Sequence, residues 1–390
     1  MTSRERLLRA LNCQESDHVP CCFMSFSALR KRHNEDMFAL CRAELAMGLD
    51  SALFIPAVGR PRRRDHPDLR GLPVRAAPEV ETREWREVGD GDKDALHKEY
   101  VTPAGTLSTS VRPSEDWTHG DHIPFIDDYQ IPRQIKPLVT EASELPALEF
   151  MLTPPSEEDE AAFKEESERA HGFVKEHGAL LVGGWGVGMD MASWLCGIRE
   201  LMVLNFDRPD FVEDVLDMIH HWNLKRMELT LSAPVDLYIR RAWYEGVDFV
   251  ARGFYQDAIL PRLKREVALA HEHGAKFGYI CSSGAMPLHD SHLEAGIDAL
   301  IGVDPVQGTY TDMPKVREKL AGQVATWGGV SGAVTVEMGE EEEVRAAVRE
   351  AMDALGPDGF ILSPVDNITV DRPHTWRNVD IFIDEWKKHR

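Results

Sequence analysis

The sequence lacks the cysteine spacings that hold disulfides or zinc in small domains. Its six cysteines, in a chain of 390 residues, include no Cys-x-x-Cys pair. This pattern is typical of reduced, mostly buried thiols. The sequence also lacks an apolar run of the roughly 20 residues that cross a membrane. Residues 1–14 predict an amphipathic helix and lack the apolar core of a signal peptide, so we expect a cytoplasmic protein with no membrane partner.

Basic residues are scarce. Lysine and arginine total 44 against 66 acidic residues, which gives a net charge of -22. A chain this negative repels phosphate backbones, so we expect no nucleic-acid partner. Two acidic clusters, at 157–160 and 340–343, precede helical patterns. Carboxylates favour helix N-termini, and we interpret both clusters as helix starts rather than as binding patches.

Several catalytic motifs are also missing. The sequence contains no nucleophile elbow and no His-Glu-x-x-His zinc motif. The glycine run at 183–188 has the wrong spacing for a phosphate loop and no following Lys-Ser/Thr. His289 and His292 have i,i+3 spacing, and we interpret them as solvated helix residues.

Eight short apolar runs, most of them followed by a helical pattern, predict the fold. They lie at 19–24, 51–56, 179–186, 235–244, 276–281, 299–304, 324–330 and 360–365. Alternating strands and helices predict a parallel sheet. The count of eight favours a (β/α)8 TIM barrel, an α/β fold, over a doubly wound open sheet. We therefore predict one barrel domain over 1–390.

A long irregular segment interrupts this alternation between the second and third runs. Residues 80–115 alternate as strands do, with a Pro-Ala-Gly turn between two of them. A helix is predicted from about Ser156 to His177. We interpret 60–175 as a β-hairpin and helical insertion that covers the barrel mouth.

Reactive groups in such barrels lie at the C-terminal ends of the strands. Three acids, Glu245, Asp304 and Asp366, fall there beside tyrosines and tryptophans, which suits proton transfer to an aromatic or amphipathic small molecule. Purely structural roles for these residues stay open as alternatives. Asp304 would cap the next turn, Asp366 and Asn367 would form an Asx turn, and the tryptophans would belong to the core.

The C-terminal third identifies a family. "GYICSSGAMPLHDSHLEAGIDALIGVDPVQG", "VATWGGVSG" and the segment from "EEEVRAAVREAMDALG" to "FILSPVDNI" resemble the uroporphyrinogen decarboxylase superfamily, as does the opening "RERLLRALNCQESDHVPCCFM". The resemblance implies a barrel. It allows two activities, decarboxylation of porphyrinogens and methyl transfer that involves corrinoid proteins. The arginine-rich segment of the decarboxylases is not matched after the first run, although Arg30, Lys31 and Arg32 follow a little later.

The thiol-using methyltransferases of this superfamily bind zinc through a His-x-Cys and a later Cys. Here Tyr279 replaces the histidine, Cys281 matches the first cysteine, and Asp366 lies near the place of the second. Zinc is therefore not favoured. If a zinc site existed, its ligands would be Cys281, Glu245 and Asp366.

The resemblance favours a methyltransferase that moves a methyl group from a small methoxylated or N-methylated substrate to the cobalt of a corrinoid (cobalamin) on a separate protein. A decarboxylase and a non-catalytic, small-molecule-binding barrel are the alternatives, and family analogy favours a homodimer. The expected catalytic residues are Glu245, Tyr279, Asp366 and Tyr244. The expected substrate-binding residues are Trp185, Trp243, His119, Asp304, Asn367 and Met24.

Overall fold

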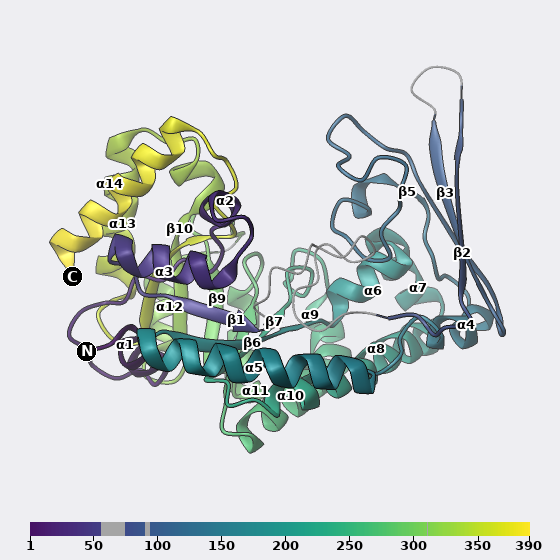
Figure 1. The fold of residues 1–390 in the computed structure, drawn as a ribbon, viewed down its shortest axis with the longest axis horizontal. Helices are drawn as coiled ribbons and strands as arrows, with labels where there is room; N and C mark the ends of the chain where they lie inside the picture. The colour runs from purple at the N-terminus through teal and green to yellow at the C-terminus, as the bar shows by residue number, and fades with distance from the viewer. Residues whose placement is uncertain (56–74, 90–93, 310) are drawn as a thin grey trace. The chain divides into compact units, whose positions relative to one another are not determined.

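The computed structural model describes residues 1–55, 75–89, 94–309 and 311–390 (Figure 1). The chain forms two compact units. Unit 1 comprises residues 1–59, 163–184 and 230–390, and unit 2 comprises residues 60–162 and 185–229. Among the helices of the described ranges, none is long and apolar enough to cross a membrane.

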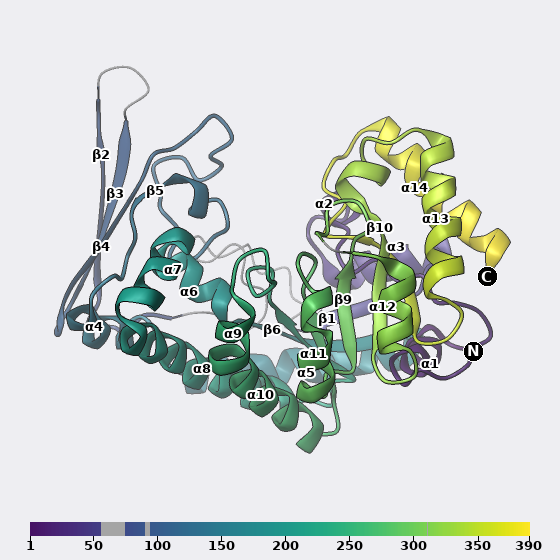
Figure 2. The same cartoon turned by 180° about the vertical axis from the view of Figure 1, so that it is seen from behind.

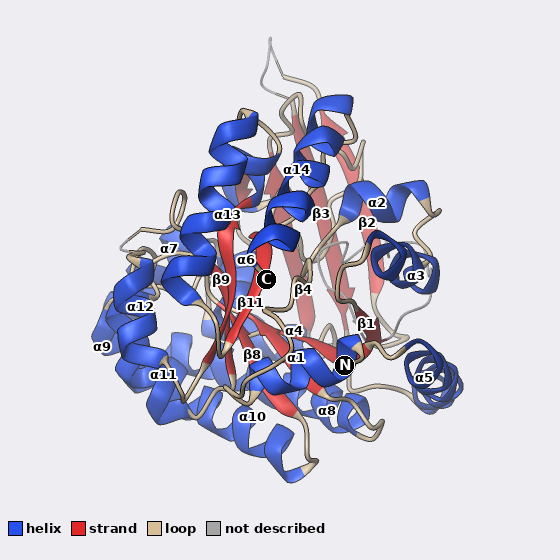
Figure 3. Ribbon diagram, turned by 90° about the vertical axis from the view of Figure 1, so that its left-hand side faces the viewer, coloured by secondary structure: helices blue, strands red, loops and turns tan. Residues whose placement is uncertain are grey.

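A parallel sheet of seven strands organises unit 1, and it curls as its strands follow one another (Figure 3). The strand order is β1-β6-β7-β8-β9-β10-β11. Nearly every residue of these strands is buried, as expected for a parallel sheet covered on both faces, which explains why each strand appeared as an apolar run. The strands are β1 (Ala52–Ile55), β6 (Leu180–Gly186), β7 (Leu237–Arg241), β8 (Lys276–Ile280), β9 (Ala299–Val303), β10 (Ala325–Ser331) and β11 (Phe360–Val365).

The run at 19–24, the first of the eight predicted strands, does not form a regular strand. It makes two isolated parallel bridges, from Cys21 to Leu362 of β11 and from Cys22 to Asp50 just before β1. Two features keep the ladder from extending. Pro20 has no N–H to donate, and the Cys21 N–H donates to the Asp50 carboxylate at 3.1 Å. The parallel α/β architecture is confirmed, whereas the count of eight strands is not.

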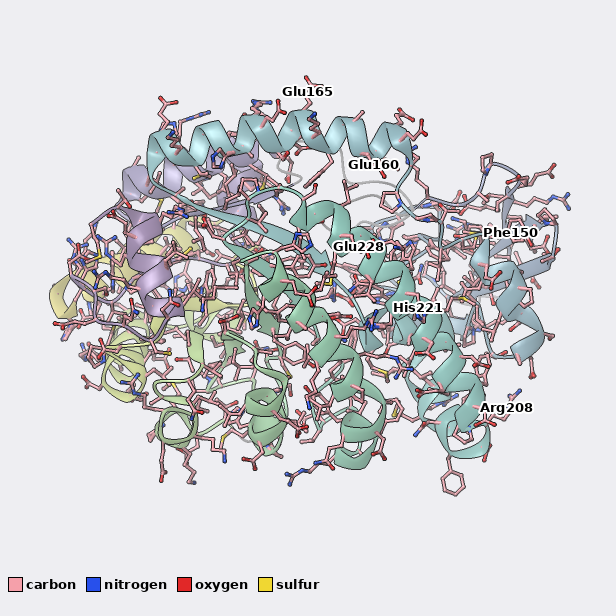
Figure 4. The ribbon with its side chains drawn as sticks, turned by 90° about the horizontal axis from the view of Figure 1, so that it is seen from below. Phe150, Glu160, Glu165, Arg208, His221 and Glu228 are labelled. Carbon is pink, nitrogen blue, oxygen red and sulfur yellow. The ribbon has the colours of Figure 1, made fainter. Side chains whose placement is uncertain are left out.

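Helices follow the strands of unit 1, and α12 and α13 lie beside β10 (Figure 2). The acidic clusters do begin helices, because α5 starts at Glu157 and α13 at Glu341. The Glu165 side chain projects outward from α5 (Figure 4). The helices that belong wholly or partly to unit 1 are α1 (Ser3–Leu11), α2 (Ser27–Arg32), α3 (Met37–Met47), α5 (Glu157–His177), α8 (Pro209–Leu231), α9 (Arg252–Phe254), α10 (Leu260–Glu272), α11 (His289–Ala295), α12 (Met313–Leu320), α13 (Glu341–Leu355) and α14 (Pro373–His389).

Unit 2 contains an antiparallel sheet in the order β2-β3-β4-β5. Leu96, Val111 and Ile123 form a fully buried cluster in this unit, and Trp117 packs against it. The predicted hairpin is present, because β3 and β4 pair on either side of the Pro103-Ala104 turn. The elements are β2 (Glu81–Glu87), β3 (Ala95–Thr102), β4 (Gly105–Val111), β5 (Gln134–Lys136), α4 (Leu145–Glu149), α6 (Met189–Cys196) and α7 (Ile198–Asp207).

The expected insertion over 60–175 is not confirmed as a unit. Residues 60–74 and 90–93 lie outside the described residues. Its position between a second and a third strand is not confirmed in that form, because the run at 19–24 is not a regular strand. That the segment covers a barrel mouth, within a single domain, stays a prediction.

Candidate functional site

The ends of β7 and β8 bring two of the predicted catalytic residues, Glu245 and Tyr279, into contact. Arg240 of β7 lies directly opposite Tyr279 of β8 in the parallel register. The chain then turns after β7, where the Glu245 N–H donates to the Ala242 carbonyl at 3.2 Å. This turn places the Glu245 carboxylate between the two strand ends.

Gly246 is what allows this turn to approach the loop after β8. A Cβ at Gly246 would lie 1.7 Å from the Ser283 carbonyl oxygen, a distance that no side chain tolerates. In addition, the Val247 N–H donates to the Gly284 carbonyl at 3.1 Å. The two loops are therefore joined directly behind Glu245, and glycine is required at this contact.

The Glu245 carboxylate is fully buried and accepts two hydrogen bonds. Arg240 Nη2 donates to Glu245 Oε1 at 2.5 Å, and the Tyr279 hydroxyl donates to Glu245 Oε2. Arg240 and Tyr279 are also almost completely buried, at 2% and 0% exposure. Such an ion pair is tolerated in the interior because the carboxylate faces a charged guanidinium and also accepts a hydrogen bond from the tyrosine hydroxyl.

A second layer of side chains surrounds this pair. Glu266 Oε2 of α10 lies 3.3 Å from Arg240 Nε. The Tyr255 hydroxyl donates to the Tyr279 hydroxyl at 3.4 Å. We call Tyr255, Tyr279, Glu245, Arg240 and Glu266 the buried polar chain, because hydrogen bonds or ion pairs join each member to the next.

Electrostatics fix the protonation states of this chain. Burial raises the pKa of Tyr279 well above its ordinary value, and the neighbouring Glu245 charge raises it further. The same two causes raise the pKa of Tyr255. Burial lowers the pKa of Arg240, but Glu245 and Glu266 outweigh burial, so that the net change is upward. The structure thus holds a charged guanidinium beside two neutral phenols.

His289 and His292 are not solvated helix residues, which corrects the interpretation drawn from their spacing. They are 3% and 0% exposed. The His292 ring packs against Tyr279 at 5.4 Å and against Tyr255 at 6.1 Å between ring centroids. Burial lowers the pKa of His292 to about 3 and that of His289 to about 4. Both rings are therefore neutral, and the His292 ring packs against the two tyrosines of the buried polar chain.

Tyr244 and Trp243 are the half-buried residues of the same turn. The Tyr244 ring packs edge-on against Phe249 at 5.2 Å, and the Arg241 guanidinium lies 4.1 Å from the centre of the Trp243 ring. Asp366, the other predicted catalytic residue, is exposed after β11 with a positive φ of 69°. The assignment of Tyr244, Trp243 and Asp366 to catalysis and binding stays a prediction.

Three predicted binding residues make local hydrogen bonds at strand ends. Asp304 Oδ1 accepts the N–H groups of Val306 and Gln307 at 2.8 and 3.0 Å, an Asx-type turn. Asn367 Oδ1 accepts the Ser27 N–H at 2.9 Å. The Met24 N–H donates to Ser363 Oγ at 3.3 Å. These contacts explain the placement of the residues, while their predicted role in binding substrate is untested.

Trp185 and His119 belong to unit 2. Trp185 is 4% exposed on β6. His119 Nε2 lies 3.3 Å from Asp127 Oδ2, and the His119 ring packs edge-on against Trp117 at 4.8 Å. Both residues thus have a structural place, and their predicted contact with substrate remains a prediction.

The three residues named for zinc do not fit a metal centre. The Cys281 thiol is 1% exposed and faces the Ser283 carbonyl oxygen at 3.7 Å. Glu245 is engaged by Arg240 and Tyr279. Within the part of the chain that the structure describes, no three histidine, cysteine or acidic side chains come together as metal ligands. We therefore derive no step that uses a resident metal.

Sequence reasoning missed Arg240, Tyr255, Glu266 and the burial of His292. One signal was available. Arg240 and Arg241 end an apolar strand that a parallel sheet buries on both faces, and a buried arginine requires a carboxylate partner. Tyr255 and Glu266 gave no comparable signal, since their places depend on how α9 and α10 pack.

Comparison with known proteins places this fold in an enzyme family. Residues 126–389 match the uroporphyrinogen decarboxylase (URO-D) family, which is more than half of the chain. The chain belongs to this family, as the sequence predicted. No curated protein sequence matches the chain.

Solved structures resemble the chain at low sequence identity. A methyltransferase from Methanosarcina mazei has a TM-score of 0.59 and 16% identity, covering 100% of this chain and 99% of that chain. A B12-independent methionine synthase from Shewanella sp. W3-18-1 has a TM-score of 0.40 and 11% identity, covering 57% of this chain and 65% of that chain. The first likeness shows a common fold along the whole chain.

Proposed function

We propose that this chain is the methyltransferase component of a corrinoid-dependent demethylase system. It would move a methyl group from a small methoxylated or N-methylated substrate to the cobalt of a separate corrinoid protein. The observation that supports this proposal is the buried polar chain at the ends of β7 and β8. It occurs in a family member that shares its fold with a methyltransferase over its full length.

The reaction explains why the buried polar chain would be useful. When the bond between the methyl carbon and oxygen breaks, its electron pair stays on oxygen, which then needs a proton. A corrinoid on the partner protein would supply reduced cobalt as the nucleophile for the methyl group. The present chain would bind the substrate, exclude water and deliver the proton.

We assign these roles among the predicted residues. Glu245 faces the Arg240 guanidinium and accepts hydrogen bonds, so it serves as a carboxylate rather than as a proton donor. Glu245 and Tyr279 would act as positioning residues that fix the turn at 242–246. Tyr244, which is half-buried on that turn, would present its hydroxyl to the leaving oxygen or nitrogen.

The decarboxylase alternative is disfavoured by the arginines that follow the first apolar run. A porphyrinogen carries several carboxylates and needs unpaired guanidinium groups to hold them. Arg30 Nε lies 2.6 Å from Glu35. Arg32 lies 2.5 Å from Asp371 and covers the Trp376 ring at 3.8 Å. These two arginines are therefore committed within the chain.

A methyl-transfer assay tests the proposal. The purified protein is incubated with a panel of methoxylated aromatics and methylated amines that carry a deuterated methyl group, together with a cobalt(I) corrinoid protein. We expect the cobalt(I) absorbance to fall and the label to appear on the corrinoid for at least one substrate. No transfer across the panel, while a known methyltransferase loads the same corrinoid protein, would contradict the proposal.

Two variants tie the activity to the site. Tyr244→Phe and Tyr279→Phe each remove one hydroxyl, and we expect the rate to fall by about 10²-fold or more for Tyr244→Phe. Tyr238→Phe is the matched control, because Tyr238 is almost fully buried like Tyr279, lies on β7 and packs against Phe277. The control should retain activity. Equal losses in all three variants would show that the effect is structural.

A further inference from the structure

The outer edge of β2 is an exposed strand edge in unit 2. Among the residues that the structure describes, β2 pairs with β3 on one side only, as the last strand of its sheet. All seven of its residues are exposed. Unpaired strand edges offer N–H and C=O groups to another strand, so an exposed edge is a template for association.

An aromatic side chain stands at the centre of this edge. Trp85 is 46% exposed, and its ring stacks on His97 of β3 with centroids 5.1 Å apart and an interplanar angle of 11°. This stacking holds the indole on the outer face of the sheet. Val88, just beyond β2, is 79% exposed. A fixed, half-exposed tryptophan is the kind of residue that anchors protein interfaces.

The charges along β2 are self-complementary in one antiparallel register. When two β2 strands pair about a two-fold axis at Trp85, Arg83 of each copy lies opposite Glu87 of the other. The axis also brings the two Trp85 side chains together. Moving the axis to Glu84 instead places Glu81 opposite Glu87, and moving it to Arg83 places the two Arg83 side chains opposite each other. Like charges directly opposite destabilise a strand pair, so the sequence selects the first register.

Neither side chain of the favoured pair is committed elsewhere in a buried contact. Arg83 lies 3.6 Å from Glu81, and both are more than 60% exposed. Glu87 lies 3.1 Å from His97 Nε2 and is 72% exposed. By contrast, the neighbouring Glu84 accepts hydrogen bonds from within unit 2, including the Ile123 N–H at 3.1 Å. The outer face of β2 therefore keeps its charges available for a second copy.

We infer that two copies of this chain associate edge to edge through antiparallel β2 strands, with Trp85 of each copy at the two-fold axis. The contact would join the two antiparallel sheets into one continuous sheet. Since two strands of seven residues form a small interface, the dimer should be weak, with a dissociation constant of the order of micromolar.

Charge reversal tests this register directly. Sedimentation equilibrium of the full chain over a range of concentrations should show a reversible dimer. Arg83→Glu and Glu87→Arg should each weaken it by about tenfold or more, because each creates two like-charge pairs by symmetry. The double variant Arg83→Glu/Glu87→Arg restores the pairs in reverse and should recover the wild-type constant.

A control and a second readout complete the test. Arg199→Glu reverses an 87% exposed arginine on α7, and it should leave the dimer unchanged. Trp85→Cys should form an intermolecular disulfide on mild oxidation, since facing residues of antiparallel strands lie within disulfide reach. A chain that stays monomeric, or a dimer that both single reversals leave intact, would overturn the inference.

Discussion

Removal of the Glu245 carboxylate should destabilise the protein strongly, because it leaves Arg240 charged and buried. The two side chains are 0% and 3% exposed, and Arg240 Nη2 lies 2.5 Å from Glu245 Oε1. Breaking a buried ion pair by removing one partner costs roughly 3–5 kcal/mol. The Tyr279 hydroxyl also loses its acceptor. We therefore expect Glu245→Ala to lose roughly 3–5 kcal/mol of unfolding free energy.

Glu245→Gln removes the negative charge but keeps the size of the side chain, so it separates the effects of the two. The amide oxygen still accepts the Tyr279 hydroxyl, and Glu266 still lies 3.3 Å from Arg240 Nε. About half of the loss seen with alanine is therefore expected, roughly 2 kcal/mol. Urea-induced unfolding followed by circular dichroism measures both variants. Methyl transfer is then measured on the Glu245→Gln protein under conditions where it is folded.

Glu385→Gln is the matched control for this pair of variants. Glu385 on α14 also accepts from two arginines, Arg345 and Arg349, at 2.8 Å each. Those arginines are partly exposed, at 20% and 36%, so water compensates for a lost charge. The control should lose much less stability than Glu245→Ala. If Glu245→Ala instead unfolds within about 1 kcal/mol of the wild type, the buried pair does not carry the energy assigned to it. A folded and fully active Glu245→Gln protein would show that the Glu245 charge has no part in methyl transfer.

Three further predictions concern other buried positions. Burial raises the pKa of Glu44, which accepts a hydrogen bond from the Ser51 hydroxyl, to about 8. The folded state therefore retains this proton to a higher pH than the unfolded state, and the free energy of unfolding should fall by about 3 kcal/mol as the pH rises from 5 to 8. Glu44→Gln should flatten this pH dependence in urea titrations. Burial lowers the pKa of His292 to about 3, so the unfolded state binds the proton at a higher pH than the folded state. About 3 kcal/mol of unfolding free energy should therefore be lost as the pH falls from 6.5 to 4. His292→Leu should remove that loss, and an unchanged pH dependence in acid would contradict the prediction. Gly246→Ala should lower both stability and methyl transfer, because its Cβ meets the Ser283 carbonyl oxygen; Gly253→Ala, where a Cβ meets nothing within 4 Å, should leave both unchanged in the same assays.

The strands of the parallel sheet could be predicted because each is largely apolar and almost entirely buried. Residues 276–280 and 360–365, for example, are almost entirely buried, so composition alone marked them. The run at 19–24 has the same composition, but its hydrogen bonds decide otherwise, since Cys21 donates to a side chain rather than to a neighbouring strand. Composition reports burial, whereas a regular strand also needs an uninterrupted ladder.

The site was predictable only where strand ends determine position. Glu245 and Tyr279 follow from the rule that reactive groups lie at C-terminal strand ends, and the structure does bring them together. The burial of His292 did not follow from the sequence, because an i,i+3 pair on a short helix is compatible with either face. Which face is buried depends on the packing of Tyr255 and Tyr279 against α11, a contact between segments far apart in the chain.

The exchange of histidine for Tyr279 has a physical consequence for its neighbours. A neutral imidazole could bind a metal, whereas a phenol with a raised pKa keeps its proton and donates a hydrogen bond to Glu245. Glu245 in turn needs the Arg240 guanidinium to stay charged in the interior. Tyrosine at this position therefore goes together with the buried ion pair, and Cys281 is buried with its thiol 3.7 Å from the Ser283 carbonyl oxygen. Cys281→Ser should therefore alter methyl transfer far less than Tyr279→Phe, and the reverse order of effects would indicate thiolate chemistry.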